Sequence, residues 1–289
     1  MKISEKVTGK TIIGVDMGGT KIRTGKIKNN AVDTIASDFV PKTDDANEVT
    51  DVLIKLITNV IDKEVAGIGI GVPSLVDSEK GIVYNVQNIP SWEEVFLKDI
   101  LEDKFGIPVY INNDANCFAV GERFFGKGRE HEDFVGLICG TGLGAGIIKN
   151  GHLMPDRNCG SGEFGEIPYL DQIYEYYCSG QFFPNVYNEG GEAMAKKARE
   201  NDPRALKAYD EFGHHLGKAI KTIMLAVDPA AIIMGGGVAE SFELYSDEMW
   251  NEIRDFPYPR SVENLQIVTT QTQEIALLGA AALYLDANV

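Results

Sequence analysis

The sequence has few cysteines and no long apolar segment, and each shortage excludes a class of protein. Its 4 cysteines lie far apart without a C-x-x-C pair, which argues against a disulfide framework and against the usual spacing of zinc ligands. No apolar run approaches the roughly 18 residues of a membrane span. Lysines and polar residues interrupt the N-terminal segment until Ile12, unlike the core of a signal peptide. We therefore expect a cytoplasmic protein with reduced thiols.

Positive charge is also scarce. The chain of 289 residues contains 27 lysines and arginines against 43 aspartates and glutamates, which gives a formal net charge of −16. Such a surface repels nucleic-acid phosphates and anionic lipids, so we expect neither a nucleic acid nor a membrane as partner. Hydrophobic residues make up 44% of the chain, and this composition and length predict a globular protein of about two domains.

The hydrophobic pattern predicts an α/β fold with two similar halves. In each half a short apolar strand runs into a glycine-rich turn and a second strand, at residues 12–28 and 134–149. Apolar spacings of three and four then predict amphipathic helices at residues 48–62 and 204–227. The polar segment 189–201 is predicted to lie on the surface. We expect two α/β domains with a cleft between them, namely residues 1–116, completed by a C-terminal helix at 274–289, and residues 117–273.

The two glycine-rich turns are candidate phosphate-binding segments. Adjacent glycines in the segment 16–20 let backbone N–H groups approach an anion, although a plain hairpin turn explains them equally well. The second turn, 140–146, superficially matches the dinucleotide fingerprint G-x-G-x-x-G. That fingerprint requires a helix after the turn, whereas Ile147-Ile148-Lys149 predicts a strand. A nicotinamide-dependent oxidoreductase is therefore disfavoured, and a hairpin that holds a phosphate remains.

Several polar residues follow predicted strands. Asn113 and Asp114 lie between a short strand and a helix, where one of them is expected to cap the helix. At this place Asp114 could also act as a general base that takes a proton from a substrate hydroxyl. Glu163, Glu166 and Glu175 follow in a stretch rich in glycine and aromatic residues, either as a solvated acidic loop or as carboxylates that bind sugar hydroxyls.

The order of these motifs resembles the ROK family (repressors, open reading frames and sugar kinases), which has the sugar kinase, actin and Hsp70 ATPase fold. The resemblance covers nearly the whole chain. The segments that carry it are Ile13–Lys21, Gly71–Asp77 with Asn88–Trp92, Asn112–Asn116, Gly140–Gly146 and Gly235–Val238.

The resemblance implies an ATP-dependent hexose kinase that phosphorylates the sugar 6-hydroxyl, with Asp114 as general base and Mg²⁺ held indirectly by Asp16. It implies that ATP contacts Gly18, Gly19, Thr20, Lys21, Gly140, Thr141, Gly142, Gly235, Gly236 and Gly237. It places the sugar against Gly71, Asn88, Asn113, Asp114, Glu163, Glu166 and Glu175. It also implies a homodimer.

The chain departs from the family pattern in one region. The family has G-E-x-G-H followed by the zinc loop C-x-C-G-x-x-G-C. Here Gly162–Gly165 matches, but Glu166 replaces the histidine and the cysteine loop is absent. We therefore predict no structural zinc. Because a carboxylate at neutral pH accepts hydrogen bonds but donates none, we also expect an altered sugar preference.

Alternatives remain for the acceptor and for the class of protein. Glucose is the first expectation, with mannose, fructose, allose and N-acetylated hexosamines behind it. Sugar-sensing repressors of the family carry a winged helix-turn-helix before the first phosphate segment, which here begins at Ile12, and the net charge opposes DNA binding. An ATPase that acts on no sugar is disfavoured by Asn113 with Asp114 and by Glu163 with Glu175.

Overall fold

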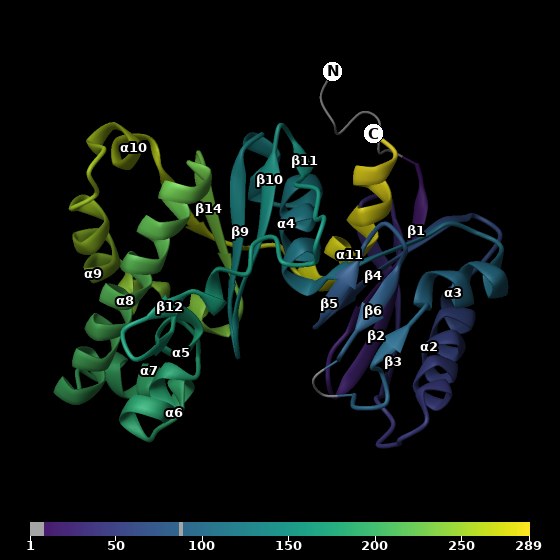
Figure 1. Cartoon of the computed structure of the whole chain (residues 1–289), viewed down its shortest axis with the longest axis horizontal. Coiled ribbons are helices and arrows are strands. Elements are labelled where there is room, and N and C mark those ends of the chain that lie inside the picture. Colours follow the sequence, from purple (N-terminus) through teal and green to yellow (C-terminus); the bar gives the residue numbers. More distant parts are fainter. Residues whose placement is uncertain (1–8, 87–88) are drawn as a thin grey trace. The chain divides into compact units, whose positions relative to one another are not determined.

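The computed structural model describes residues 9–86 and 89–289, which form two compact units (Figure 1). The first unit contains the chain up to residue 132 together with 148–161 and 271–289, and the second contains 133–147 and 162–270. Within the described residues, a five-stranded sheet forms the centre of each half of the chain. The predicted α/β class with two similar halves is confirmed.

The first sheet has the order β3-β2-β1-β4-β8. Its strands are β1 (Thr11–Met17), β2 (Lys21–Lys28), β3 (Ala31–Phe39), β4 (Val65–Val72) and β8 (Val109–Asn113). The first three strands form an antiparallel meander, whereas β4 and β8 run parallel to β1. The carboxyl ends of β1, β4 and β8 therefore meet at one edge of the sheet.

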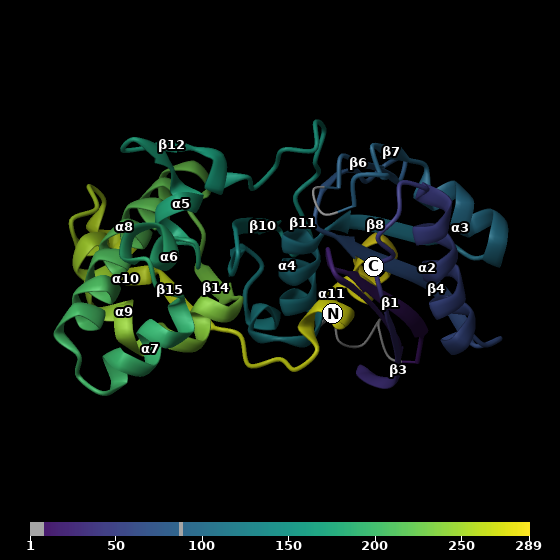
Figure 2. The same ribbon diagram turned by 90° about the horizontal axis from the view of Figure 1, so that it is seen from below.

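Helices cover both faces of this sheet. Figure 2 shows α2 (Ala46–Val60) and α3 (Leu97–Phe105) on one side, with α4 (Asp114–Phe125) and α11 (Ile275–Ala287) on the other. The apolar stripe of α2 is buried, as its spacing predicts. In contrast, α11 is apolar around most of its circumference because it packs against β1, β4 and α4 at once.

The contact between α11 and the sheet depends on glycines. A Cβ atom at Gly69 would lie 1.8 Å from the Ala280 carbonyl oxygen, and one at Gly14 would lie 2.0 Å from the Leu277 carbonyl oxygen. Without side chains at these positions, the backbones of sheet and helix touch directly. The end of the chain therefore belongs to the core of the first unit.

The second sheet has the order β11-β10-β9-β14-β15, with β14 parallel to both β9 and β15. Its strands are β9 (Phe134–Cys139), β10 (Leu143–Lys149), β11 (His152–Leu153), β14 (Ala231–Gly235) and β15 (Gln266–Thr269). The predicted long helix is confirmed as α8 (Pro203–Val227), which packs against α9 (Phe242–Arg254). A strand follows the turn, as predicted, but β10 begins at Leu143, inside the segment 140–146 that was predicted to be the turn. The structural context of a dinucleotide fingerprint is therefore absent at this turn.

Shorter elements complete the two units. They are β5 (Leu75–Asp77), β6 (Ile82–Tyr84), β7 (Glu94–Val95), η1 (Lys127–Glu130), η2 (Phe164–Glu166), β12 (Pro168–Tyr169), β13 (Gln172–Ile173), α5 (Tyr174–Cys178), α6 (Phe182–Tyr187), α7 (Gly191–Arg199), η3 (Gly237–Ser241) and α10 (Pro259–Asn264). The interpretation of 189–201 as a polar surface segment was wrong in part. This stretch forms α7, whose residues Met194, Ala195 and Ala198 are buried.

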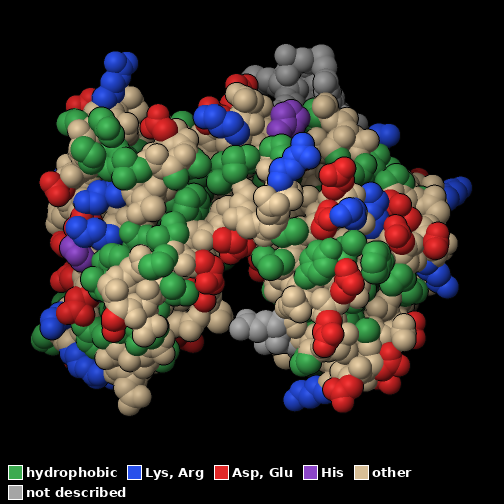
Figure 3. All heavy atoms as spheres, viewed as in Figure 1, with side chains coloured by type: hydrophobic (Ala, Val, Ile, Leu, Met, Phe, Trp, Pro, Cys, Tyr) green, Lys and Arg blue, Asp and Glu red, His purple; other side chains and the backbone are tan. Residues whose placement is uncertain are grey.

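Charge is mixed over the surface that Figure 3 shows. Lysine and arginine side chains are scattered among acidic ones rather than gathered in one patch. This face therefore offers no continuous cationic track for a nucleic-acid backbone. Among the described residues, no helix has the length and hydrophobicity needed to cross a bilayer.

The glycine contacts predict the cost of a single methyl group. We expect Gly69→Ala to lower the free energy of unfolding by at least about 2 kcal/mol, because backbone atoms of α11 must move to admit it. Gly160→Ala is the control, since its Cβ would meet only the Asn158 carbonyl oxygen at 3.9 Å. Urea denaturation of both variants measures the difference. Equal stability of the two variants would contradict this account of the α11 contact.

Candidate active site

In the first unit, polar residues gather where β1, β4 and β8 end. Asp16 on β1 lies beside Gly71 on β4, which in turn lies beside Asn112 on β8. Asp114 follows as the first residue of α4. Parallel strands of α/β proteins commonly bind their ligands at this edge, beyond their carboxyl ends. The sheet topology thus brings together residues that are about a hundred positions apart in the sequence.

The junction between β8 and α4 is fixed by two asparagines. Asn113 is the helix cap, because its Oδ1 accepts hydrogen bonds from the N–H groups of Ala115 at 2.8 Å and Asn116 at 3.1 Å. The buried Asn112 Oδ1 accepts from Asn113 N at 2.8 Å and from Asn116 Nδ2 at 2.9 Å. Of the two residues proposed for the cap, Asn113 is the one that caps the helix. Asp114 is the first residue of the helix itself.

Asp114 has the electrostatic character of a residue that exchanges protons near neutral pH. Its side chain reaches solvent, yet the surrounding protein is dense enough that desolvation raises its pKa from 3.8 to about 6. The N–H of Ala115, which donates to Asp114 Oδ1 at 2.9 Å, opposes this shift, and the negative charge of Asp16 adds to it.

Asp16 is the second carboxylate of this edge. Burial raises its pKa, the nearby Arg23 guanidinium lowers it, and the Glu274 carboxylate raises it. Arg23 and Glu274 form an ion pair with each other. A magnesium ion commonly takes one or two protein carboxylates and completes its shell with water and phosphate oxygens, so the Asp16 carboxylate fits such a site. Among the described residues, no group of three or more His, Cys, Asp or Glu side chains could hold a metal ion, and the absence of zinc stays a prediction.

The turn between β1 and β2 lies at this same edge. Gly18 N donates to Lys21 O at 2.9 Å and closes a hairpin, which confirms the predicted turn. Gly18 and Gly19 are half-buried, whereas Thr20 and Lys21 are exposed. Their contact with phosphate stays a prediction.

Gly71 and Asn88 are two further residues proposed to contact the sugar. Gly71 is buried, and a Cβ atom there would lie 3.1 Å from Cys117 Sγ. Any contact of Gly71 with a substrate would therefore use its backbone. Asn88 lies outside the described residues.

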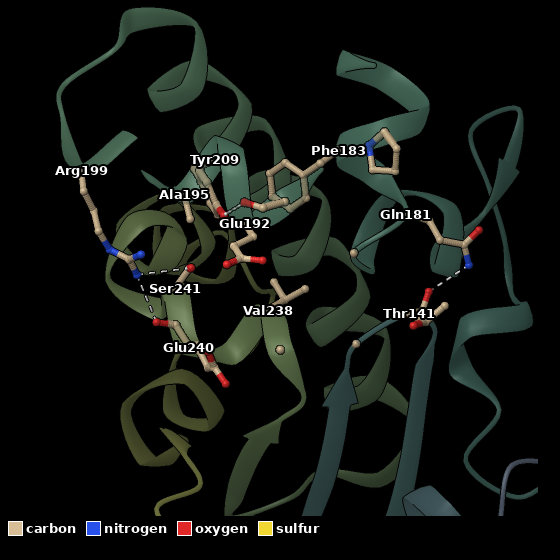
Figure 4. Close-up of a pocket in the computed structure, with 15 residues that line it drawn as sticks. Thr141, Gln181, Phe183, Glu192, Ala195, Arg199, Tyr209, Val238, Glu240 and Ser241 are labelled. Carbon is tan, nitrogen blue, oxygen red and sulfur yellow. Dashed lines mark hydrogen bonds between the residues drawn. The ribbon is translucent and has the colours of Figure 1, made fainter. Parts of the chain in front are cut away.

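The second unit contains a cavity of about 710 Å³. Figure 4 shows Thr141 and Gln181 at one end and Arg199 and Glu240 at the other, with Val238 between them. The walls come from the β9–β10 turn, α6, α7, α8 and η3. This volume and the mixture of apolar walls with polar ends suit a small organic ligand.

Three of the predicted glycines shape this cavity. Gly236 has φ 85° and a Cβ atom there would lie 2.4 Å from the Cys139 carbonyl oxygen, so only glycine lets the end of β14 approach the end of β9. Gly140 and Gly237 line the cavity, and a Cβ atom at either would meet nothing within 4 Å. Of the predicted segments 140–142 and 235–237, the residues that line this cavity are therefore Gly140, Thr141 and Gly237.

The three predicted glutamates lie where η2 packs against α5. Glu166 is exposed and Glu163 is half-buried. Glu175 Oε2 accepts a hydrogen bond from Leu143 N at 3.0 Å, and its Cβ packs 3.4 Å from the position a Cβ would take at Gly165. Glu175 thus contacts the start of β10, a role that the sequence did not indicate.

Sequence reasoning missed the residues of α6 and α7 at the cavity. Glu192, Ala195 and Arg199 come from α7, and Gln181 precedes α6. The spacing of Met194, Ala195 and Ala198 was the available signal, but α7 is short and surrounded by charged residues.

Comparison with known proteins gives the family. The ROK family matches residues 12–287 of the chain. This protein belongs to the ROK family. A glucokinase of Thermotoga maritima is 29% identical, over 94% of this chain and 96% of its own length. An N-acetyl-D-glucosamine kinase of Vibrio parahaemolyticus is 32% identical, over 82% of this chain and 87% of its own length. A xylose repressor of Bacillus subtilis is 26% identical, over 95% of this chain and 77% of its own length.

A solved ROK structure supports the same assignment. The ROK glucokinase of Streptomyces griseus in complex with glucose and AMPPNP is 29% identical, covers 94% of this chain and 98% of its own, and has a TM-score of 0.77. The chain therefore has the two-domain α/β fold of ROK sugar kinases, and it is similar to glucokinases in particular.

The open glycines predict a variant that weakens nucleotide binding without loss of the fold. We expect Gly237→Ala to lower the affinity for a non-hydrolysable ATP analogue by about tenfold, because the new methyl group projects into the cavity. Gly190→Ala is the control, since its Cβ would also meet nothing within 4 Å but lies outside the cavity lining. Calorimetric titration measures both affinities. Equal affinities would show that no nucleotide approaches Gly237.

The raised pKa of Asp114 predicts a stability difference that depends on pH. The folded protein holds the Asp114 proton up to about pH 6, whereas the unfolded chain releases it near 3.8, so wild-type stability falls as pH rises between these values. We expect Asp114→Asn to have the higher Tm at about pH 8, with a smaller difference at about pH 4. Thermal unfolding at both pH values tests this, and a difference independent of pH would contradict it.

Proposed function

We propose that this protein transfers the γ-phosphoryl group of ATP to the 6-hydroxyl of a hexose, with Asp114 as general base. The observation that carries the proposal is the position of Asp114 at the head of α4, at the carboxyl edge of the first sheet, with a pKa of about 6. A base with a pKa just below neutral is largely unprotonated at the pH of a cell and still accepts a proton well.

In the proposed mechanism, Asp114 takes the hydroxyl proton while the sugar oxygen attacks the γ-phosphorus in line. A sugar hydroxyl is too weak an acid to ionise beforehand, so proton transfer accompanies the attack. The Asn113 Oδ1 is engaged in the helix cap, which leaves its Nδ2 group to hold the acceptor. The hydrogen bonds of Asn112 Oδ1 with Asn113 N and Asn116 Nδ2 fix the backbone at the start of α4, from which Asn113 and Asp114 project.

The cavity of the second unit is the proposed adenosine site. Gly235, Gly236 and Gly237 would lie along the adenosine, and Gly140, Thr141 and Gly142 would contact the phosphates. In the first unit, the turn with Gly18, Gly19, Thr20 and Lys21 is the second proposed phosphate segment. Mg²⁺, held by Asp16 through water, would offset the negative charge of the phosphates when bound.

Glucose is the proposed acceptor, supported by the similarity to glucokinases. Glu163, Glu166 and Glu175, with Gly71 and Asn88, are the proposed contacts of its hydroxyls. Another hexose, such as fructose, mannose, allose or an N-acetylhexosamine, is the alternative. The 32% sequence identity to an N-acetyl-D-glucosamine kinase supports the N-acetylhexosamine. The exposed carboxylate of Glu166 would favour hydroxyl and amide donors on the sugar.

A non-catalytic sugar-sensing regulator is the second candidate, because a xylose repressor is among the relatives. A regulator needs a sugar site but no general base. Desolvation raises the pKa of Asp114, and keeping a carboxylate in such a place costs stability. A residue retained at that cost favours the catalytic candidate over the regulator.

A coupled ADP-release assay with ATP, Mg²⁺ and a panel of hexoses tests the proposal. We expect wild-type ADP release to depend on sugar, and its kcat/KM to fall as pH drops through about 6, since Asp114 must be unprotonated. Asp114→Ala should lower kcat by about 10²- to 10⁴-fold while sugar binding stays measurable. Asp103→Ala is the control, because Asp103 is an exposed residue of α3.

Each other outcome excludes part of the proposal. Near-normal turnover of Asp114→Ala would show that Asp114 is not the base. ADP release that is independent of every sugar would indicate an ATPase, and binding of a sugar without ADP release would indicate a regulator.

A further inference from the structure

The turn between β9 and β10 is attached to the end of α5 by a series of hydrogen bonds. Cys139 Sγ donates to Cys178 O at 2.9 Å, and Gly180 N donates to Gly140 O at 2.7 Å. Further along, Gln181 Nε2 donates to Thr141 O at 2.9 Å. The turn is therefore held by the chain that leaves α5, with one bond per residue from Cys139 to Thr141.

The side chains of Glu175 and Gln181 also form hydrogen bonds in this region. Glu175 Oε2 accepts from Leu143 N at 3.0 Å, which fixes the residue where β10 begins. Gln181 Nε2, which donates to Thr141 O, also lies 3.4 Å from Glu175 Oε1 and donates to it. Glu175 and Gln181 thus hold the turn from both of its sides.

The chemistry of the partners dictates the orientation of the Gln181 amide. Gln181 faces two oxygen atoms, Thr141 O and Glu175 Oε1, so its NH₂ group, with two hydrogens, can donate to both at once. Gln181 also lines the nucleotide cavity, where Figure 4 shows its amide nitrogen directed at Thr141 and its amide oxygen directed away. The Gln181 side chain thereby links the cavity, the turn and Glu175, a residue proposed to bind the sugar.

We propose that Gln181 is a positioning residue that couples the binding of sugar to the binding of ATP. The proposal rests on the function proposed above, in which Glu175 contacts the sugar and Thr141 contacts the phosphates. A sugar that fixes Glu175 also fixes the Gln181 amide, and through it the Thr141 carbonyl and the adjoining amides of the turn. By thermodynamic linkage, a phosphate held by that turn then favours the sugar by the same factor.

A purely structural role for Gln181 makes a different prediction. The bond from Gly180 N to Gly140 O and the Cys139 thiol hold the turn without Gln181, and the backbone N–H of Gln181 is separately bonded to Ser179 Oγ at 3.2 Å. Removal of the side-chain amide therefore leaves the local fold attached. If Gln181 served the fold alone, its loss would change stability but not the dependence of one ligand on the other.

The test compares Gln181→Ala and Gln181→Glu with the wild type. Gln181→Glu keeps the length of the side chain but replaces the donor by a carboxylate that repels both partners. The matched control is Asn185→Ala, because Asn185 is an exposed amide residue of α6, the helix that begins directly after Gln181, and lies outside the cavity lining. Thermal unfolding first shows that each variant is folded.

Calorimetry then measures the affinity for the β,γ-imido analogue of ATP with and without the hexose that gives the highest ADP release. We expect the hexose to raise the affinity of the wild type and of Asn185→Ala by at least about fivefold, a typical coupling between two sites. In Gln181→Ala the ratio should fall to about 1, and in Gln181→Glu to 1 or below. The affinity for the hexose alone should stay within about twofold of the wild type in Gln181→Ala.

Kinetics give the second readout. Loss of the Gln181 link between Glu175 and Thr141 should lower kcat of Gln181→Ala by about tenfold, with the KM for ATP raised at saturating hexose. A wild-type coupling ratio in Gln181→Ala, or a ratio of 1 in the wild type, would overturn the proposal even if the wild type is an active kinase. Absence of sugar-dependent ADP release from the wild type would instead overturn the proposed function, and this inference with it.

Discussion

In both units, the elements that carry the candidate site approach one another so closely that a side chain at the contact would overlap backbone atoms. In the first unit, Gly14 and Gly69 let α11 rest directly on β1 and β4. In the second, Gly236 lets the end of β14 meet the end of β9. Close packing of backbones leaves little room for adjustment, because protein interiors are as dense as organic crystals. These contacts fix β1 and β4 against α11, and the end of β14 against β9.

The first unit places carboxylates where the packing of the fold makes their charge costly. Asp16 and Asp114 come from strand and helix ends that meet at one edge, and burial raises the pKa of both. The asparagines around Asp114 compensate in part by satisfying the backbone at the start of α4. Such a pair costs stability, whereas a carboxyl group whose pKa lies near neutral suits the proton transfer proposed for Asp114.

The second unit combines an open cavity with a turn that is held by hydrogen bonds. Gly140 and Gly237 leave space, while Glu175 and Gln181 restrain the chain beside it. An enzyme that catalyses phosphoryl transfer acts mainly by positioning the reactants and stabilising charge, and less by covalent chemistry. A turn whose carbonyl and amide groups are fixed from two sides suits that task, since less of the binding energy is spent on ordering it.

The sequence by itself determined several helices and strands and indicated the family. The periodicity of α2 and α8, the strand that follows the second glycine-rich turn and the polar residues after strand ends all have local causes. The ordered motifs indicated the family. The cap at the head of α4 was left open between Asn113 and Asp114, because side-chain geometry alone decides which oxygen reaches the free N–H groups. The helix α7 was missed because its apolar stripe is short and gains its stability from packing on α8.

Only the tertiary structure decided how distant residues meet. The pKa of Asp114 depends on the density of protein around it and on Asp16, which spacing along the chain does not reveal. The bonds of Glu175 to Leu143 and of Gln181 to Thr141 join residues 32 and 40 positions apart. Local sequence sets the propensity of each element, but such long-range contacts arise from the packing of all elements together, and they give the site its chemistry.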